Sequence, residues 1–170
     1  TGAPTWSSNQ NITLGTAVAT TSGTSHDFTG IPAGVRRIIV SLAGISTNGT
    51  SALLLQIGDA GGIEATGYNG NSVAILTLAV GSMVAWSTGI QIMTSQTATH
   101  LYSGIITLML LDAATFTWAI NSQVGASAGT LRQDIGAGSK SLSAELTQLR
   151  LTSVSGDTFD AGSVNIAYEL

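Results

Sequence analysis

Apolar residues in this chain come in short runs that are separated by clusters of Gly, Ser, Thr and Asn. In two of these runs, residues 35–45 and 163–170, an apolar residue recurs at every second position. A period of two places the apolar side chains on one face of a β-strand. The side chains that share such a face are Ile38, Val40 and Leu42 in the first run and Val164, Ile166, Tyr168 and Leu170 in the second. Both runs are therefore predicted to be strands with one buried face.

Two other runs, "SALLLQIG" (residues 51–58) and "SGIITLMLLD" (residues 103–112), are apolar on both faces. Gly and Ser bracket both runs, and the lengths of the runs favour strands over a buried helix. A strand that is apolar on both faces is typically buried on both sides. In an antiparallel protein one side would face the domain core, and the other side is expected to face a neighbouring subunit.

Turn-forming residues separate the remaining candidate strands. These strands are expected over residues 11–19, 25–28, 62–67, 72–80, 86–93, 115–124 and 146–154. The turn signals between strands include "STNGTS", "YNGN" and "GAGSK". In "SLSAELTQLR" the residues Leu142, Leu146 and Leu149 recur at helical spacing, so a short helix stays open as an alternative there.

About ten strands spaced by turns predict an all-β fold, an antiparallel β-sandwich of the jelly-roll kind. Residues 11–170 are expected to form one such domain. Residues 1–10 are polar and rich in turn formers, and are predicted to be a linker from an upstream region of a longer protein.

The composition points to an assembly of several chains. Charged residues make up only 8% of the chain, against about 25% in typical soluble proteins, while hydrophobic residues make up 44%. No stretch reaches the roughly 18–20 consecutive apolar residues that cross a bilayer, so membrane insertion is not expected. Part of the uncharged surface is expected to be covered by other copies of the chain. With five Lys and Arg and a net charge of −4, nucleic acid and anionic membrane surfaces are not expected as partners.

Candidate catalytic and metal-binding residues are few. The chain has two histidines, His26 and His100, without metal-ligand spacing, and it has no cysteine. No G-x-S-x-G nucleophile motif is present. We therefore expect no catalytic residue, no metal and no cofactor. One alternative is open, in which Asp59 and Glu64 face each other across a hairpin as the paired carboxylates of a glycan-processing enzyme.

A second acidic pair, Asp157 and Asp160, lies in "SGDTFDAG". Aspartates in such turns accept hydrogen bonds from nearby backbone N–H groups. The pair is predicted to hold the loop of a C-terminal hairpin, with Phe159 anchored beneath it. A loose calcium or sodium site is the alternative for this loop.

Aromatic residues make up only 5% of the chain, so each is a candidate for recognition. An exposed aromatic ring stacks on the apolar face of a sugar, and amides bond the sugar hydroxyls. Tyr68, with Asn69 and Asn71 beside it, is the candidate group for binding a receptor or glycan. Trp86 and Trp118 are further candidates, and packing in the core or in an interface is their alternative role.

Two blocks of sequence carry a family resemblance. The stretch "SGTSHDFTGIPAGVRRIIVSLAGISTNGTSALLLQIGDAGGIEATGY" and the ending "SGDTFDAGSVNIAYEL" resemble the C-terminal domains of bacteriophage and prophage tail fibre and tail spike proteins. The resemblance runs from about residue 14 to residue 170 and is weak between residues 71 and 139, where variable receptor-contacting loops are expected.

The resemblance implies a homotrimer on the virion, at the tip of a tail fibre or spike, that acts at the host cell surface. It implies attachment to a polysaccharide, a lipopolysaccharide or an outer-membrane protein, and it carries over no catalytic residue. The alternative is a structural trimerisation or capping domain that does not contact the receptor.

Overall fold

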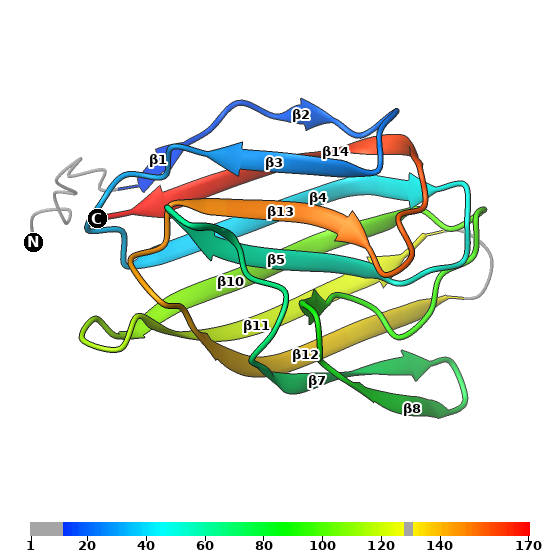
Figure 1. Ribbon diagram of the computed structural model, residues 1–170. Coiled ribbons are helices and arrows are strands. Elements are labelled where there is room, and N and C mark those ends of the chain that lie inside the picture. Colours follow the sequence, from blue (N-terminus) through cyan, green and yellow to red (C-terminus); the bar gives the residue numbers. More distant parts are fainter. Residues whose placement is uncertain (1–11, 128–130) are drawn as a thin grey trace, which may run out of the picture.

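The computed structural model describes residues 12–127 and 131–170 of the chain. This part of the chain contains fourteen strands and no helix. The strands form two antiparallel sheets that face each other, with the smaller sheet in front of the larger one in the view of Figure 1. The predicted all-β sandwich is confirmed. The predicted linker, residues 1–10, lies outside the described residues.

The larger sheet has nine strands. Along the sheet they are β1 (Ile12–Leu14), β14 (Phe159–Glu169), β4 (Arg37–Thr47), β10 (Tyr102–Asp112), β11 (Thr117–Ala126), β12 (Arg132–Ser141), β7 (Tyr68–Leu76) and β8 (Val80–Ala85), and β2 (Val18–Ala19) also pairs with β14. The smaller sheet consists of β3 (Ser25–Thr29), β13 (Gln148–Ser153), β5 (Leu53–Asp59) and β6 (Gly62–Ile63), and β9 (Ile90–Gln91) pairs with β5.

The core lies between the two sheets. The side chains that the larger sheet contributes to this core are the apolar ones that recur at every second position of the sequence. Fully or nearly fully buried residues face one another from both layers, among them Ile38, Val40, Ile106 and Leu108 from the larger sheet and Leu53, Leu55, Ile57, Leu149 and Leu151 from the smaller one. Burying each such side chain contributes about 1.5–3 kcal/mol.

The segment from Trp86 to His100 extends the smaller layer over β11, β12 and β7. Trp86, Ile92 and Met93 are buried in it. The indole Nε1 of Trp86 donates a hydrogen bond to Ser72 Oγ on β7 at 2.8 Å. The inner side of the larger sheet is therefore covered here by an irregular segment.

Strand β12 was not predicted, and "GAGSK", which reads as a turn, lies inside it. A Cβ added at Gly138 would lie 2.4 Å from the carbonyl oxygen of Asn69 and 2.5 Å from the Trp86 ring. Glycine in a strand interior often marks such a close approach. Gly138 is therefore required by the packing of Trp86, and Gly136 by the close approach of Ser72 and Ser122, not by a turn.

The predicted C-terminal hairpin is wrong. Its two strands, β13 and β14, belong to different sheets, so the connection between them crosses from one layer to the other. The alternative helix over residues 141–150 is also wrong: Leu142 and Leu146 are buried in an irregular connection and Leu149 lies in β13.

The two runs that are apolar on both faces have different surroundings. Every residue of β5 is buried. Its second face is covered by the chain's own residues 87–89, where the Gln56 side chain donates to the Thr88 carbonyl at 2.7 Å. In β10, by contrast, Ile105, Met109 and Leu111 are exposed in the single chain. Of these two runs, β10 is therefore the one that leaves an apolar side for a neighbouring subunit to cover.

Candidate interaction surface on the larger sheet

The three aromatic residues predicted to bind a receptor are buried. Tyr68, Trp86 and Trp118 are 7%, 4% and 2% exposed. Trp86 and Trp118 therefore have their alternative role, which is packing in the core. For Tyr68 the expected exposure is wrong, because its side chain points between the sheets.

The Tyr68 hydroxyl has a structural role. It accepts a hydrogen bond from the backbone N–H of Ile57 at 2.8 Å and donates to the Glu64 carbonyl at 2.9 Å. Burial raises the pKa of this phenol to about 12. Tyr68 thus fixes β7 to the smaller sheet.

Asn69 and Asn71 are exposed on the other side of β7. Successive side chains of a strand point to opposite faces, so neither asparagine shares a surface with Tyr68. The predicted group of one aromatic and two amides is therefore divided between the core and the surface.

The two asparagines belong to a wide uncharged surface, which we call the outer face. It is formed by the outward side chains of β7, β8, β10, β11 and β12. These are Asn69, Asn71, Val73, Ile75, Met83, Ala85, Ser103, Ile105, Thr107, Met109, Ala119, Asn121, Gln123, Gly125, Gln133, Ile135, Ala137 and Ser139. None of them carries a charge. Asp112, in the last position of β10, is a charged residue at the edge of this face.

A mostly apolar row crosses the outer face perpendicular to the strands. Strand pairing places Met83 opposite Val73, Val73 opposite Ile135, Ile135 opposite Gln123 and Gln123 opposite Ile105. Met83, Ile135 and Ile105 are 69%, 38% and 50% exposed. Cross-strand neighbours on one face are close enough to touch, so the row is a continuous ridge.

Shallow hollows lie beside this ridge, where the outward residues are small. One of about 250 Å³ lies next to Ile135 and Met83 at Ala137. A second of about 220 Å³ lies between Met109 and Ala119. A third of about 300 Å³ lies at Gly125, beside Ile105. The outer face thus alternates apolar projections with depressions of side-chain size.

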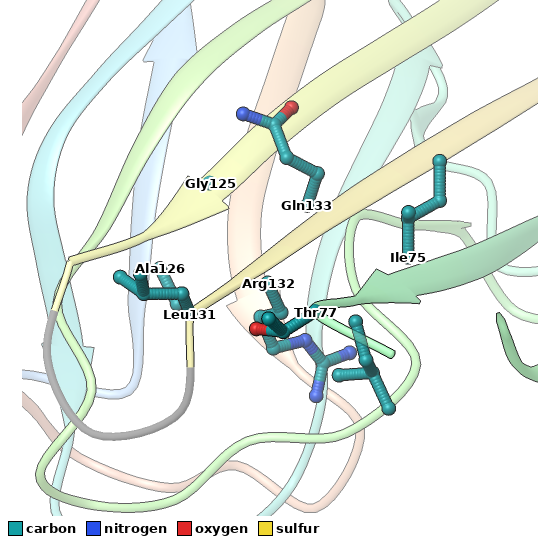
Figure 2. A pocket seen from close by; sticks show the side chains of 8 residues that line it. Ile75, Thr77, Gly125, Ala126, Leu131, Arg132 and Gln133 are labelled. Atoms are coloured by element: carbon teal, nitrogen blue, oxygen red, sulfur yellow. The ribbon is translucent and has the colours of Figure 1, made fainter. Parts of the chain in front are cut away.

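A further hollow, of about 330 Å³, lies where β7, β11 and β12 end (Figure 2). Figure 2 shows Gln133 and Arg132 on opposite sides of β12. The Arg132 guanidinium is occupied by other partners, since it donates to Asp134 Oδ2 at 2.7 Å and to Ser95 Oγ at 2.9 Å. It therefore offers little to an anionic ligand.

Arg132 and Asp134 also fix the neighbouring segment. Asp134 is fully buried, and its Oδ1 accepts a hydrogen bond from the backbone N–H of Thr94 at 2.9 Å. The pair holds residues 94 and 95 against β12.

Asp59 and Glu64, the candidate catalytic pair, both bind Ser143. Ser143 Oγ donates to Asp59 Oδ2 at 2.5 Å, and the Ser143 backbone N–H donates to Glu64 Oε1 at 2.8 Å. The hydrogen bond from Ser143 is the main cause of the lowered pKa of Asp59. Burial acts to raise the pKa of Glu64, but hydrogen bonds from Lys140 and Ser143 outweigh it, and that pKa is also lowered.

A general acid of a glycosidase needs a raised pKa, which neither carboxyl has. The two carboxylates instead hold the connection between β12 and β13 against the turn that joins β5 and β6. This geometry favours a structural role for the pair.

Asp157 and Asp160 differ in their contacts. Asp157 Oδ2 accepts a hydrogen bond from the backbone N–H of Ser51 at 2.8 Å and so joins two loops. Asp160 is exposed, and no side-chain hydrogen bond of this residue is seen within the described part of the chain. Phe159 is 1% exposed, as predicted, and its ring packs edge-on against His26 with a centroid distance of 4.9 Å.

Within residues 12–127 and 131–170, no three acidic or histidine side chains are grouped as metal ligands. The same residues contain no helix that is long and apolar enough to span a membrane. No protein-family model matches the chain, and a search of curated proteins finds no match.

Proposed function

We propose that this chain is the attachment domain at the tip of a bacteriophage or prophage tail fibre or tail spike. In this proposal it is a homotrimer on the virion and binds a surface receptor of the host bacterium, which is a polysaccharide, a lipopolysaccharide or an outer-membrane protein. The resemblance of two sequence blocks to such domains supports the proposal, and so does the way these blocks pack.

The two resembling blocks form one packed unit. The first block contains β3, β4 and β5, and the second contains β14. Strand β14 pairs with β4 from Phe159 to Glu169, and Asp157 of the second block binds Ser51 of the first. Residues 71–139, where the resemblance is weak, supply β8, β9, β10 and β11 and most of β7 and β12.

Several loops gather at one end of the sandwich, on the right in Figure 1. We call this the loop end, formed by residues 48–51, 77–79, 94–98 and 154–158. Hydrogen bonds hold three of these loops in place: Ser51 binds Asp157 of a second loop, Gln96 binds Thr47 at the end of β4, and Ser95 binds Arg132 at the start of β12. The loop end is thus a contiguous and irregular surface.

The position of the loop end carries the proposal. Ile12 pairs with Glu169, at one end of β14, whereas residues 154–158 precede its other end. Eleven residues of strand extend over roughly 35 Å. A fibre region preceding Ile12 would therefore approach the sandwich from the end opposite the loop end, and the loops would face the host.

A binding assay on host cells tests this function. The labelled chain is expected to adsorb to host cells and to compete with adsorption of the phage. Ala98→Glu at the loop end is expected to reduce adsorption at least 10-fold. Ala113→Glu, at another exposed alanine in the turn between β10 and β11 at the opposite end, is the matched control and should adsorb like the unchanged chain.

Adsorption that is equal for both variants would contradict receptor contact at the loop end. No adsorption of the unchanged chain to any susceptible strain would favour the second candidate, a structural trimerisation or capping domain. The uncharged outer face is the observation that favours this second candidate.

A further inference from the structure

We infer that the outer face is the surface through which copies of this chain contact one another. This inference rests on the proposed homotrimer and adds to it the contacting strands, β7, β8, β10, β11 and β12. The loop end remains free for the receptor, because it lies at the ends of these strands and not on their outward side.

The charge distribution favours a second copy as the occupant. The charges on the outward sides of β4 and β14, next to the outer face, are Arg37 and Glu169, which pair with each other at 2.6 Å, and Asp160 at the start of β14. A neutral surface meets a copy of itself without like-charge repulsion, whereas a basic or acidic partner would find no complementary charge on it.

The projections and hollows of the outer face also fit a second copy of the chain. The apolar side chains that project from it are Ile105, Met109, Ile135 and Met83, and hollows of about 220–300 Å³ lie beside them. Placing the apolar projections of one copy in the hollows of another removes apolar surface from water at about 25 cal/mol per Å². Exposed apolar patches of this extent mark interaction sites on soluble proteins.

The area is sufficient for a stable contact. Strands are about 4.8 Å apart and rise about 3.3 Å per residue, so five strands present a face of the order of 600 Å². Stable interfaces bury about 800 Å² per partner. The outer face, together with its rim on β4, reaches this size as a whole, and in a homotrimer each copy divides it between its two neighbours.

A glycan fits the outer face less well. Sites for small ligands are lined by aromatic and hydrophobic groups in a concave cleft. None of the outward side chains of the outer face is aromatic. The amides Asn71, Asn121 and Gln123 would meet sugar hydroxyls, but no ring is available to stack on a sugar.

Sedimentation velocity of charge variants tests the inference. Ile135→Glu and Ile105→Glu each place a charge in the proposed contact, and Val154→Glu is the control at an apolar residue with 54% exposure beyond the outer face. We expect the unchanged chain and Val154→Glu to sediment at three times the chain mass of 17.2 kDa. The assemblies of the two face variants should dissociate at protein concentrations at least about 100-fold higher than the assembly of the unchanged chain does. Their circular dichroism spectra should be unchanged.

Gln123→Lys is a second variant for the same face. Its side chain is polar and exposed, so the substitution leaves the core intact even if the isoleucine variants fail to fold. Weakened assembly of Gln123→Lys supports the inference. If the unchanged chain is a trimer and the face variants assemble equally well, the outer face is not the contact, although the homotrimer stands. A monomeric unchanged chain at micromolar concentration would overturn both.

Discussion

Asp134 on β12 accepts a hydrogen bond from the backbone N–H of Thr94 at 2.9 Å, and Arg132 on the same strand donates to the same carboxylate. Asp134 is fully buried, and the Arg132 side chain is 8% exposed. This contact ties the irregular segment over the larger sheet to a strand of that sheet.

Asp134→Ala is expected to lower the free energy of unfolding by about 3–5 kcal/mol, because it leaves a buried guanidinium without its counter-charge. Urea unfolding followed by tryptophan fluorescence measures this loss. Asp160→Ala, at an exposed aspartate, is the control and should change stability by less than about 0.5 kcal/mol. A loss below about 1 kcal/mol for Asp134→Ala would show that the buried pair contributes little.

Asp157→Ala is expected to lower the free energy of unfolding by about 1–2 kcal/mol, because the partly buried N–H of Ser51 then loses its acceptor. Thermal unfolding of the Asp157→Ala and Asp160→Ala variants gives the comparison. Receptor adsorption of Asp157→Ala should fall only as far as its folded fraction does. Equal stability of the two variants would refute the assigned difference between the aspartates.

Gly138→Ala tests the packing of β12 against Trp86. The new methyl group would lie 2.4 Å from the Asn69 carbonyl, so we expect a loss of about 1–3 kcal/mol or more from overpacking. At Gly125 on the neighbouring strand the nearest atom to an added Cβ is 3.4 Å away, and Gly125→Ala should be tolerated. Chemical unfolding of both variants measures this difference. Equal midpoints for Gly138→Ala and Gly125→Ala would contradict the assigned packing of β12.

The pH dependence of stability tests the role of Asp59. Hydrogen bonds from Ser143 and from the Gly61 N–H hold its pKa below the ordinary 3.8 in the folded state. A carboxyl with a lowered folded-state pKa contributes stability above its unfolded pKa, and this contribution is lost as the pH falls through the folded-state pKa.

Asp59→Asn is therefore expected to be about 1–2 kcal/mol less stable than the unchanged chain at pH 7. This difference should shrink as the pH falls from about 5 to below 3. Urea unfolding at several pH values measures it. A difference that stays constant down to pH 2.5 would show that the Asp59 carboxylate does not contribute through its charge.

The sequence was sufficient to predict the strands whose apolar pattern is set by packing in the core. In β4 and β14 the apolar residues that share a face in the sequence are buried between the sheets. Strand β12 could not be predicted, because its glycines leave room for side chains that are distant in sequence, Trp86 at Gly138 and Ser72 at Gly136. Strand β14 pairs with β4 and not with β13, and this choice is likewise set by contacts between segments that are remote in sequence.

The candidate site was only partly predictable for the same reason. Tyr68 stands next to two asparagines in the sequence, and only the orientation of β7 decides that Tyr68 points inward. The sequence does contain one signal of the outer face, because the run from residue 103 to residue 112 is apolar on both faces. Its extension across β11, β12 and β7 depends on strand order, which the pattern of a single strand does not contain.

The most direct test of the account is the accessibility of a single cysteine on the outer face. The chain has no cysteine of its own, so Ile105→Cys and Val154→Cys each introduce one thiol, at positions that are 50% and 54% exposed in the single chain. Maleimide labelling of the native assembly compares their rates. Coverage by a second copy predicts that Ile105→Cys reacts at least 10-fold more slowly than Val154→Cys, and that the rates become equal in denaturant. Equal rates in the native assembly would contradict coverage of the outer face.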